Sequence, residues 1–444
     1  MKFRGLLAAV VVLAALGGAA WWSEKKQKVD AAKPSADASP KILSIPEDQF
    51  KQIDLVKKAG DTTQLTKADG KWQIVQPKPL AADQDSVKSL VTSLSSLASD
   101  RLIEDKPSDL SSYGLTAPSE QVKITRNDGK TQTVLVGDDT PTGSGTFAKL
   151  ENDPRVFMIA SYVKTSLDKT SKDLRDKRLL TFNSDKLTRV DLTAKGSGVE
   201  FGKNNQNEWQ ILKPKPLRAD GLQVDELVRR LKDAKMDASS SDEDAKKAVA
   251  GFSTGARVAV AVVIDAGGTQ QIEVRKDKDK NYYARSSVVE GIYKVTSDLG
   301  DGLDKGLDDF RNKKLLDFGW NDPNKLEIRN GTTQATYQKS GDKWMSGAKQ
   351  MDAPSIQALV DKLRDLTSTK FLDTGNGAAI FEATVTSNDG KRVEKVAIWK
   401  QGDKYDARRE GEPSVYELDA KAVDDLLKAA GGVKEYQAPK GGKK

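Results

Sequence analysis

The segment Trp72-Gln73-Ile74-Val75-Gln76-Pro77-Lys78-Pro79-Leu80 recurs almost unchanged as Trp209-Gln210-Ile211-Leu212-Lys213-Pro214-Lys215-Pro216-Leu217. A third tryptophan, Trp344, stands 135 residues after Trp209, which itself stands 137 residues after Trp72. A match at a nearly fixed period indicates that one structural unit is repeated along the chain. We therefore predict three tandem copies of one module.

Each of these tryptophans is followed by an aspartate and then by apolar residues at helical spacing. The aspartates are Asp83, Asp220 and Asp352. The apolar positions are Val87, Leu90, Val91 and Leu94 in the first copy, Val224, Leu227, Val228 and Leu231 in the second, and Ile356, Leu359, Val360 and Leu363 in the third. An aspartate before such a run is typical of a helix N-cap, and Pro-Lys-Pro cannot join a helix interior. We predict that a helix begins at each aspartate.

Short alternating segments separated by turn residues surround each predicted helix, as expected for antiparallel strands. The last of these segments carries an aromatic residue in each copy, namely Phe157, Tyr293 and Tyr416. A second helix is predicted to close the unit and to run to the end of residues 174–180 in the first copy and of residues 310–316 in the second. The pattern predicts an α+β fold in which each module is an antiparallel, meander-type sheet with two packed helices.

These signals divide the chain into six parts. We expect a membrane anchor or signal over residues 1–22, a flexible linker over 23–41, modules over 42–182, 183–318 and 319–436, and a disordered basic tail over 437–444. The linker is rich in Lys, Ala, Ser, Asp and Pro and almost free of apolar residues, which is typical of a flexible tether.

The N-terminus predicts a membrane contact through residues 5–22, GLLAAVVVLAALGGAAWW, which carry no charge. As a helix they would cover about 27 Å, close to the ~30 Å hydrocarbon core of a bilayer. Gly18-Ala19-Ala20 has the small residues of a cleavage site, so a cleaved signal stays an alternative. Trp21 and Trp22 suit the membrane–water interface instead. We therefore predict an uncleaved, single-pass anchor with the large C-terminal body outside.

Composition excludes several classes of activity. The chain has 444 residues, no cysteine and no histidine, which excludes disulfides, thiolate catalysis and every site that needs imidazole. The formal net charge is +7, of which residues 1–41 contribute +4 and residues 434–444 contribute +3. The repeated body is therefore neutral and lacks the clustered basic face of a nucleic-acid-binding protein. We expect no nucleic-acid partner.

Several short motifs of the first copy resemble a known family. They are Trp72 with Pro77 and Asp83, Tyr113-Gly114-Leu115 with Pro118, Val136-Gly137, Val156-Phe157 and Leu174-Arg175-Asp176-Lys177. Through these motifs residues 50–182 resemble the bacterial domain-of-unknown-function family numbered 4340. The second copy resembles it with losses, since Ala250-Gly251-Phe252 replaces Tyr-Gly-Leu, and the third copy only faintly. The resemblance implies an anchored protein of the bacterial inner membrane with its body in the periplasm, no assigned activity, and genes for gliding-type ABC transporters nearby.

Motifs that imitate ligand sites are better explained as turns. Residues 277–281, Asp-Lys-Asp-Lys-Asn, begin like a calcium loop, but Tyr282 and Val288 stand where the loop needs Gly and Glu. The segments 143–145 and 196–198, both Gly-Ser-Gly, lack the spacing of a phosphate loop. We predict no catalytic, cofactor-binding or metal-binding residues, and the family resemblance brings none.

Basic residues follow the predicted second helix of the first copy. Arg175, Lys177 and Arg178 could receive an acidic partner. Cations in the last turn of a helix are, however, favoured by the helix dipole without any partner. We therefore expect these residues to serve the helix.

Two classes of function remain. The first is a non-catalytic, membrane-tethered envelope protein that binds another protein, for which the family resemblance suggests an ABC transporter component. We expect its contacts where the copies differ, as at residues 239–244. The alternative is a carboxylate-dependent enzyme acting on an envelope polymer through pairs such as Asp138 with Asp139 or Asp308 with Asp309. Adjacent residues on a strand or helix point apart, which makes these poor acid–base pairs.

Overall fold

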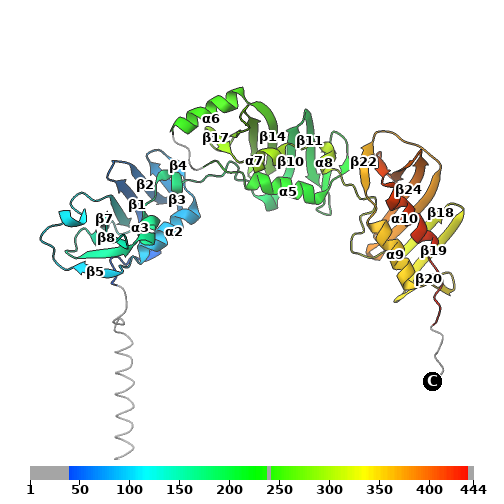
Figure 1. The fold of residues 1–444 in the computed structure, drawn as a ribbon, viewed down its shortest axis with the longest axis horizontal. Helices are drawn as coiled ribbons and strands as arrows, with labels where there is room; N and C mark the ends of the chain where they lie inside the picture. The colour runs from blue at the N-terminus through cyan, green and yellow to red at the C-terminus, as the bar shows by residue number, and fades with distance from the viewer. Residues whose placement is uncertain (1–39, 238–241, 439–444) are drawn as a thin grey trace, which may run out of the picture. The chain divides into compact units, whose positions relative to one another are not determined.

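The computed structural model describes residues 40–237 and 242–438, which form three antiparallel sheets and nine α-helices (Figure 1). The α+β class and the three sheet modules predicted from the repeat are confirmed. In these ranges no helix is both long and apolar enough to cross a membrane. The predicted anchor over residues 1–22, most of the linker and most of the basic tail lie outside the described residues.

The first sheet has nine strands in the order β4-β3-β2-β1-β6-β7-β8-β9-β5. Its strands are β1 (Phe50–Lys57), β2 (Thr62–Ala68), β3 (Lys71–Gln76), β4 (Leu80–Ala81), β5 (Arg101–Glu104), β6 (Glu120–Arg126), β7 (Thr131–Asp139), β8 (Gly145–Leu150) and β9 (Val156–Ala160). The helices of this module are α2 (Gln84–Ser95), α3 (Ser161–Leu167) and α4 (Ser171–Leu174).

The second sheet has eight strands in the order β13-β12-β11-β10-β14-β15-β16-β17. Its strands are β10 (Leu187–Ala194), β11 (Ser197–Lys203), β12 (Trp209–Lys213), β13 (Leu217–Arg218), β14 (Ala256–Asp265), β15 (Gly268–Lys276), β16 (Tyr282–Ser286) and β17 (Ile292–Val295). The helices are α5 (Gly221–Lys232), α6 (Asp242–Thr254), α7 (Ser297–Leu303) and α8 (Leu307–Phe310).

The third sheet has nine strands in the order β21-β20-β19-β18-β23-β24-β25-β26-β22. Its strands are β18 (Lys325–Asn330), β19 (Thr333–Ser340), β20 (Lys343–Ser346), β21 (Lys349–Gln350), β22 (Ser368–Leu372), β23 (Ala379–Ser387), β24 (Arg392–Gln401), β25 (Lys404–Arg409) and β26 (Val415–Leu418). The helices are α9 (Ala353–Arg364) and α10 (Ala420–Gly431). The three strand orders correspond, except that the described part of the second sheet has no counterpart of β5 and β22.

The repeated tryptophans occupy the same position in all three sheets. Trp72, Trp209 and Trp344 lie on β3, β12 and β20, directly after a tight turn, and are 7, 8 and 6 % exposed. In the first and third sheets the turn contains a glycine at positive φ, Gly70 and Gly341, where L side chains are disfavoured. The prediction that each tryptophan opens a strand after a turn is confirmed.

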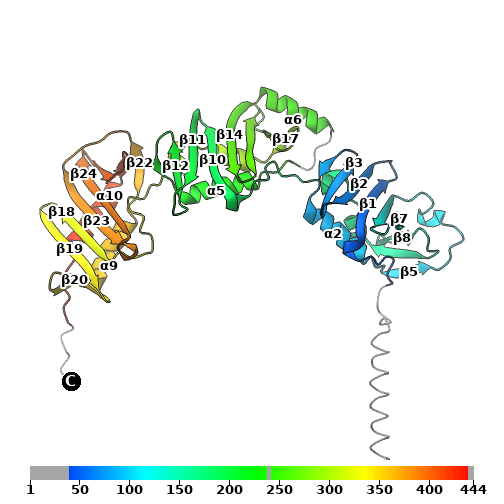
Figure 2. The same cartoon turned by 180° about the vertical axis from the view of Figure 1, so that it is seen from behind.

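The predicted helix starts are also confirmed. The carboxylates of Asp83, Asp220 and Asp352 accept hydrogen bonds from backbone N–H groups at the starts of α2, α5 and α9, at 2.8, 3.2 and 3.1 Å. The buried apolar residues of these helices are the predicted ones, with Arg364 added in α9. In the third module α9 and α10 pack together on one face of the sheet, in front of the strands in Figure 1 and behind them in Figure 2.

The predicted end of the second helix is wrong in the first and second modules. It stops at Leu174 in the first module and at Phe310 in the second, and the chain then continues in extended form. The N–H of Leu179 donates to the carbonyl of Ala234 at 2.8 Å, and Leu179 is buried in the core of the second sheet. Sequence pattern alone does not exclude a helix here, because two apolar residues after a basic run fit either a helical turn or a short buried strand.

This segment enters every module in the same way. Ile42, Leu179 and Leu315 each donate their backbone N–H to the carbonyl of the second residue after the end of α2, α5 or α9. Ile45, Phe182 and Phe318 follow three residues later and are buried in the same cores. Phe182 and Phe318 thus lie just before the predicted boundaries at 182/183 and 318/319 and are buried in the cores of the second and third sheets. The expectation of two helices per module holds for the third module, whereas the described parts of the first and second have three and four.

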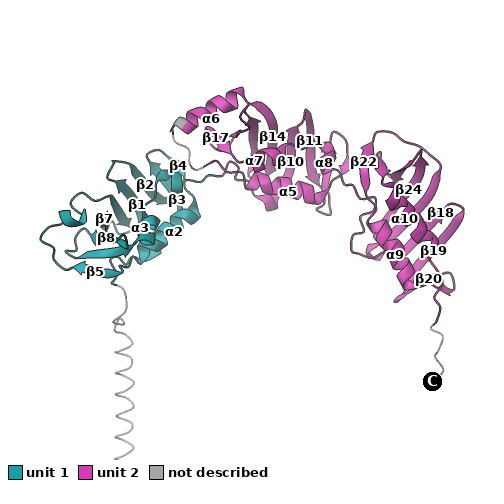
Figure 3. Cartoon of the chain, viewed as in Figure 1, with its two compact units in different colours: residues 1–177 teal, residues 178–444 magenta. Residues whose placement is uncertain are grey.

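The chain divides into two compact units, residues 1–177 and residues 178–444 (Figure 3). The first unit contains the first sheet, and the second unit contains the second and third sheets. The second and third sheets therefore belong to one unit.

Candidate functional site

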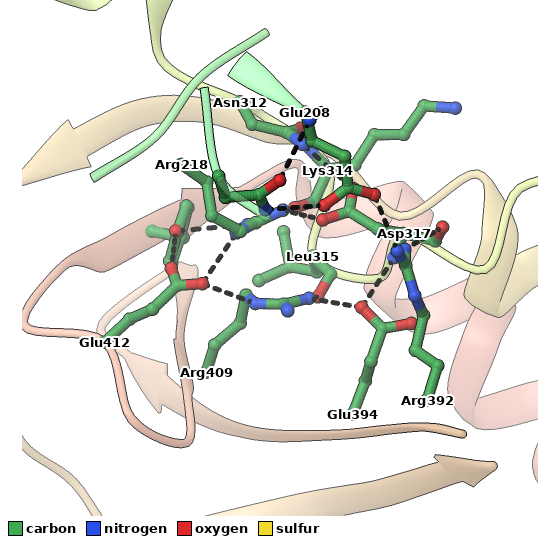
Figure 4. Close-up of polar contacts among 12 residues, drawn as sticks. Glu208, Arg218, Asn312, Lys314, Leu315, Asp317, Arg392, Glu394, Arg409 and Glu412 are labelled. Carbon is green, nitrogen blue, oxygen red and sulfur yellow. Dashed lines mark hydrogen bonds and ion pairs between the residues drawn. The ribbon is translucent and has the colours of Figure 1, made fainter. Parts of the chain in front are cut away.

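A network of charged side chains lies where the second sheet meets the third (Figure 4). Its centre is Arg218, on the two-residue strand β13. The Arg218 guanidinium donates to Glu412 Oε1 at 2.6 Å, to Asp317 Oδ2 at 2.5 Å and to the carbonyl of Lys314 at 2.6 Å. A fourth, longer bond runs to the Tyr416 hydroxyl at 3.3 Å. One guanidinium thus holds two carboxylates and a carbonyl of the next module.

Arg409 on β25 extends the network into the third sheet. It donates to Glu412 Oε1 at 2.8 Å and to Glu394 Oε1 at 3.0 Å, and also to the carbonyl of Leu315. Glu394 in turn accepts from the backbone N–H of Asp317 at 2.8 Å. The segment that leads into the third module is therefore bonded to this network at the carbonyl of Leu315 and at the N–H of Asp317.

Arg392 on β24 and Asn312 complete the arrangement. Arg392 donates to the backbone carbonyl of Asp317 at 2.8 Å and to Glu208 Oε1 at 3.0 Å. Asn312 donates its side-chain amide to Asp317 Oδ1 at 2.9 Å. Asp317 thus receives bonds from the second module through Arg218 and from the third through Arg392.

The electrostatics of the network favour the charged guanidinium of Arg218. Burial alone would lower the pKa of Arg218, but the adjacent carboxylates of Asp317 and Glu412 raise it above its ordinary value. Burial raises the pKa of the Tyr416 hydroxyl, which donates to Glu412. Removing one partner from a buried network leaves an unpaired charge and typically costs about 3 to 5 kcal/mol. The arrangement acts as a clamp between two sheets, in which guanidinium groups form ion pairs with Asp317, Glu394 and Glu412.

The position of Arg218 is specific to the second module. Backbone bonds identify the equivalent residues, because Ala81, Arg218 and Gln350 each accept a hydrogen bond from the segment after the last helix of their own module. The first module has alanine there and the third has glutamine, so the equivalent side chains carry no charge.

Comparison with known proteins identifies the family. The model of the family described as Domain of unknown function (DUF4340) matches residues 72–216 and 209–379. The chain belongs to this family. No curated protein and no solved structure matches the chain.

The two DUF4340 matches begin at Trp72 and Trp209, the tryptophans that open equivalent strands. Each match therefore begins within one module and ends within the next. The first ends at residue 216 in the second module, and the second ends at residue 379 in the third. The family predicted from the motifs of the first copy is confirmed.

The carboxylate pairs singled out in the sequence are not brought into a shared site. Asp139 accepts from Thr146 at 2.6 Å and from Lys164 at 2.7 Å, and the hydrogen bond from Lys164 is the main cause that lowers its pKa. Its neighbour Asp138 lies instead against Gly114. Both carboxylates thus support local structure, in different surroundings.

The second pair shows the same division. Asp308 forms an ion pair with Arg311 at 3.1 Å. Asp309 accepts the backbone N–H of Gly306 at 2.7 Å at the start of α8. Both contacts belong to the termini of a short helix.

The calcium-like segment is a hairpin turn, as predicted. Asp277 Oδ1 accepts the backbone N–H groups of Asp279 and Asn281 at 2.9 and 2.8 Å, and Lys280 has a positive φ of 65°. Within residues 40–237 and 242–438 no group of three or more acidic side chains is placed to hold a metal.

The basic residues after the first module differ from their predicted role. Arg175, Lys177 and Arg178 follow the end of α4, so they do not form the last turn of a helix. The backbone of Arg175 is bridged to Ala82, and that of Arg178 to Lys235. They are part of the extended segment, and the helix dipole does not explain their charge.

A second charged cluster, in the first unit, was missed by sequence analysis. Lys57 on β1 lies 2.8 Å from Glu120 on β6 and also forms an ion pair with Asp168. Glu120 is 3 % exposed, and its burial raises the pKa of its carboxyl to about 7 even though Lys57 opposes this shift. The repeat contains a signal for this cluster. Lys57 and Glu120 are cross-strand partners, and the equivalent partners in the second sheet are two alanines, Ala194 and Ala259.

Proposed function

We propose that this DUF4340 member is a non-catalytic, membrane-tethered protein of the bacterial cell envelope that binds another protein, with an ABC transporter component as the candidate partner. Residues 5–22 would anchor it in the inner membrane, and the three-sheet body would lie in the periplasm. The observation that supports protein binding is a position on one face of the sheets at which the three modules share geometry but differ in chemistry and in the segment that covers it.

This position is Phe147 on β8, Tyr283 on β16 and Asp406 on β25. The register is equivalent, because each residue is followed by an alanine that pairs with Phe157, Tyr293 or Tyr416. Tyr282 packs against Gly300 of α7, so Tyr283 points to the other face of the sheet and packs against Gly251 of α6. The varied position therefore lies on the face away from α7.

A different segment covers this position in each sheet. The ring of Phe147 packs against that of Tyr113, which lies before β6 in the sequence, with the ring centroids 5.0 Å apart. Tyr283 joins Ala248 and Phe252 of α6 in a small core of its own. Asp406 lies close to Gly375, which precedes β23.

The buried framework, by contrast, is the same in all three modules. The tryptophans and the capping aspartates are shared because every copy needs them to fold. A framework that is kept while one face is varied suits a protein whose modules contact different surfaces. The contact expected at residues 239–244 stays a prediction, because residues 238–241 lie outside the described residues.

A crosslinking pulldown from intact membranes tests the proposal. The full chain, with a photo-crosslinking side chain at an exposed position of the second module, should recover a defined envelope protein. The same chain without residues 1–22, retained in the cytoplasm, should not. Recovery of no specific protein by the anchored chain would reject the binding function.

Mass spectrometry of the mature N-terminus tests the anchor separately. Retention of residues 1–22 in inner-membrane fractions is expected. A mature chain that begins at Trp21 would show that the segment is a cleaved signal.

One pair of carboxylates supports the alternative of a carboxylate-dependent enzyme. Asp406 and Glu417 are direct cross-strand partners on β25 and β26. Asp406 is 4 % exposed, and burial, followed by the charge of Glu417, raises its pKa. Glu417 is paired with Lys404 at 3.0 Å. Hydrolysis of an envelope polymer by the purified body, abolished by D406N, would favour the enzyme over the binding protein.

A further inference from the structure

The third sheet buries two polar groups that have no hydrogen-bond partner in the described part of the chain. Trp399 on β24 and Asp406 on β25 are direct cross-strand partners, and each is 4 % exposed. Among residues 40–237 and 242–438, nothing accepts the indole N–H of Trp399, and nothing donates to the Asp406 carboxylate. Tyr405 donates to Asp424 of α10, so its neighbour Asp406 points to the face of the sheet away from that helix. Trp399 lies on the same face, as a cross-strand partner must.

One short segment covers both groups, residues 374–377, Thr-Gly-Asn-Gly. A Cβ added to Gly377 would lie 2.2 Å from Trp399 Cδ1. One added to Gly375 would lie 3.4 Å from Trp399 Cζ2 and 3.5 Å from Asp406 Oδ2. In the indole ring Nε1 lies between Cδ1 and Cζ2, so the edge that carries the N–H runs along this cover segment. The donor and the carboxylate therefore both lie against the same segment.

The cover segment is weakly attached to the sheet. In the described structure no backbone–backbone hydrogen bond involves residues 374–377. Their contact with a side-chain donor is that of Arg408, which donates from Nη2 to the carbonyl of Gly375 at 2.8 Å. Segments with few hydrogen bonds open at a low cost in free energy, whereas paired core strands do not. The cover segment can therefore lift while β24 and β25 stay paired.

Packing alone does not account for the two groups beneath it. At the position of Asp406 the first and second sheets have Phe147 and Tyr283, whose rings pack under their own covering segments. A buried carboxylate without a hydrogen bond costs free energy, and so does a buried indole N–H. A ligand that bonded to both would offset this cost.

A hydroxyl group has the required chemistry. Its oxygen can accept from the indole N–H while its proton is donated to the carboxylate. Neutral sugars carry several hydroxyls, and their apolar C–H faces can pack against an aromatic ring such as that of Trp399. The Arg408 guanidinium, 5.9 Å from the centre of that ring, adds donors for a further hydroxyl.

We propose that the third module binds a neutral oligosaccharide on this face of β24 and β25. Trp399 would supply the aromatic surface and the donor, Asp406 the acceptor, and residues 374–377 a displaceable cover. The closed cover would lower the apparent affinity by the fraction of molecules in which it is open. This binding activity is separate from the proposed protein binding and does not rest on it.

Calorimetric titration of the full chain, in a detergent without sugar headgroups, tests the proposal. The probes are the hexamers of glucose and of N-acetylglucosamine, and hexaethylene glycol dimethyl ether, which accepts hydrogen bonds but cannot donate them. At least one saccharide should bind, which identifies the sugar, and the ether should not. Binding of neither saccharide, or equal binding of the ether, would overturn the proposal.

Substitutions of the two buried polar groups locate the site. W399F keeps an aromatic surface without the N–H and should weaken saccharide binding about 5-fold, whereas D406A removes a charged acceptor and should weaken it about 10-fold. D403N, in the exposed turn of the same hairpin, loses the same charge and should bind as the wild type does. A thermal midpoint no lower than that of the wild type would show that D406A is folded. Undiminished affinity in W399F or D406A, or an equal loss in D403N, would reject this site.

A glycine substitution tests the cover. The Cβ of G377A would meet Trp399 Cδ1 at 2.2 Å, so the closed position is disfavoured and saccharide affinity should rise about 3-fold as the open fraction grows. G221A, whose added Cβ meets nothing within 4 Å, is the control and should leave the affinity unchanged. An affinity of G377A at or below that of the wild type would overturn the displaceable cover.

Discussion

The guanidinium of Arg218, on the edge strand β13 of the second sheet, lies 2.5 Å from the carboxylate of Asp317, which leads into the third. Asp317 is flanked in the sequence by Leu316 and Phe318, two residues of the third core. The ion pair therefore joins one module to the residues that begin the next. Both modules lie in the compact unit of residues 178–444.

Replacing Arg218 should loosen this junction. R218A leaves the carboxylates of Asp317 and Glu412 partly buried without their shared cation, which should cost about 3 kcal/mol. The expected result is faster proteolysis and faster hydrogen exchange over residues 311–318. Q350A, at the equivalent position of the third module, is the control and should change neither. Unaltered exchange in R218A would show that the clamp does not hold the junction.

The buried tryptophan should contribute more to stability than any exposed one. W209A removes a ring that is 8 % exposed and donates to Asp225 at 2.7 Å, and should lower the free energy of unfolding by about 3 to 5 kcal/mol. W320A removes a ring that is 89 % exposed and should change it by about 0.5 kcal/mol or less. Denaturant titration of the full chain measures both. Similar losses for the two variants would contradict the role assigned to the shared tryptophan.

Much of the framework could be predicted because local chemistry and global fold agree there. The capping aspartates, the apolar stripe of α2 and the tryptophan after a turn each follow from short-range rules that the repeat states three times. The error at residues 174–180 has a different origin. Leu179 and Leu180 follow a helix in the sequence, but their burial depends on the second sheet, which local periodicity does not include.

The charged clusters could not be predicted for a related reason. Arg218, Glu394 and Glu412 are far apart in the sequence, and charged residues are usually solvated surface. Only the fold brings them together. The repeat did contain a hint, since Arg218 and Ala81 occupy equivalent positions, and a charge that appears in one copy alone is not required by the framework.

The stability of the first unit should depend on pH through Glu120. Its folded pKa of about 7 lies above its ordinary value of 4.5, so the folded state holds the proton more tightly than the unfolded state. This contribution is fully present below pH 4.5 and is lost as pH rises through 7, which amounts to about 3 kcal/mol at most. Hydrogen exchange over β1 and β6 should therefore accelerate between pH 5 and 8 beyond the intrinsic rate. E120Q should remove that excess, and a variant that keeps it would rule out Glu120 as the source.

The second sheet predicts how the Lys57–Glu120 pair can be replaced. Ala194 and Ala259 stand directly opposite each other at the equivalent positions and are both buried, so the fold accommodates two small residues there. K57A alone leaves the Glu120 carboxylate buried without its cation. At pH 8 this variant should lower the free energy of unfolding of the first unit by about 2 to 3 kcal/mol. The cost is below that of a fully buried pair because Lys57 is partly exposed. K57A/E120A removes both charges and should lose less than K57A, which can be measured by hydrogen exchange over β1 and β6. At pH 5, where Glu120 is protonated, the two variants should converge. A double variant less stable than K57A at pH 8 would show that the pair contributes more to the first unit than the second sheet implies.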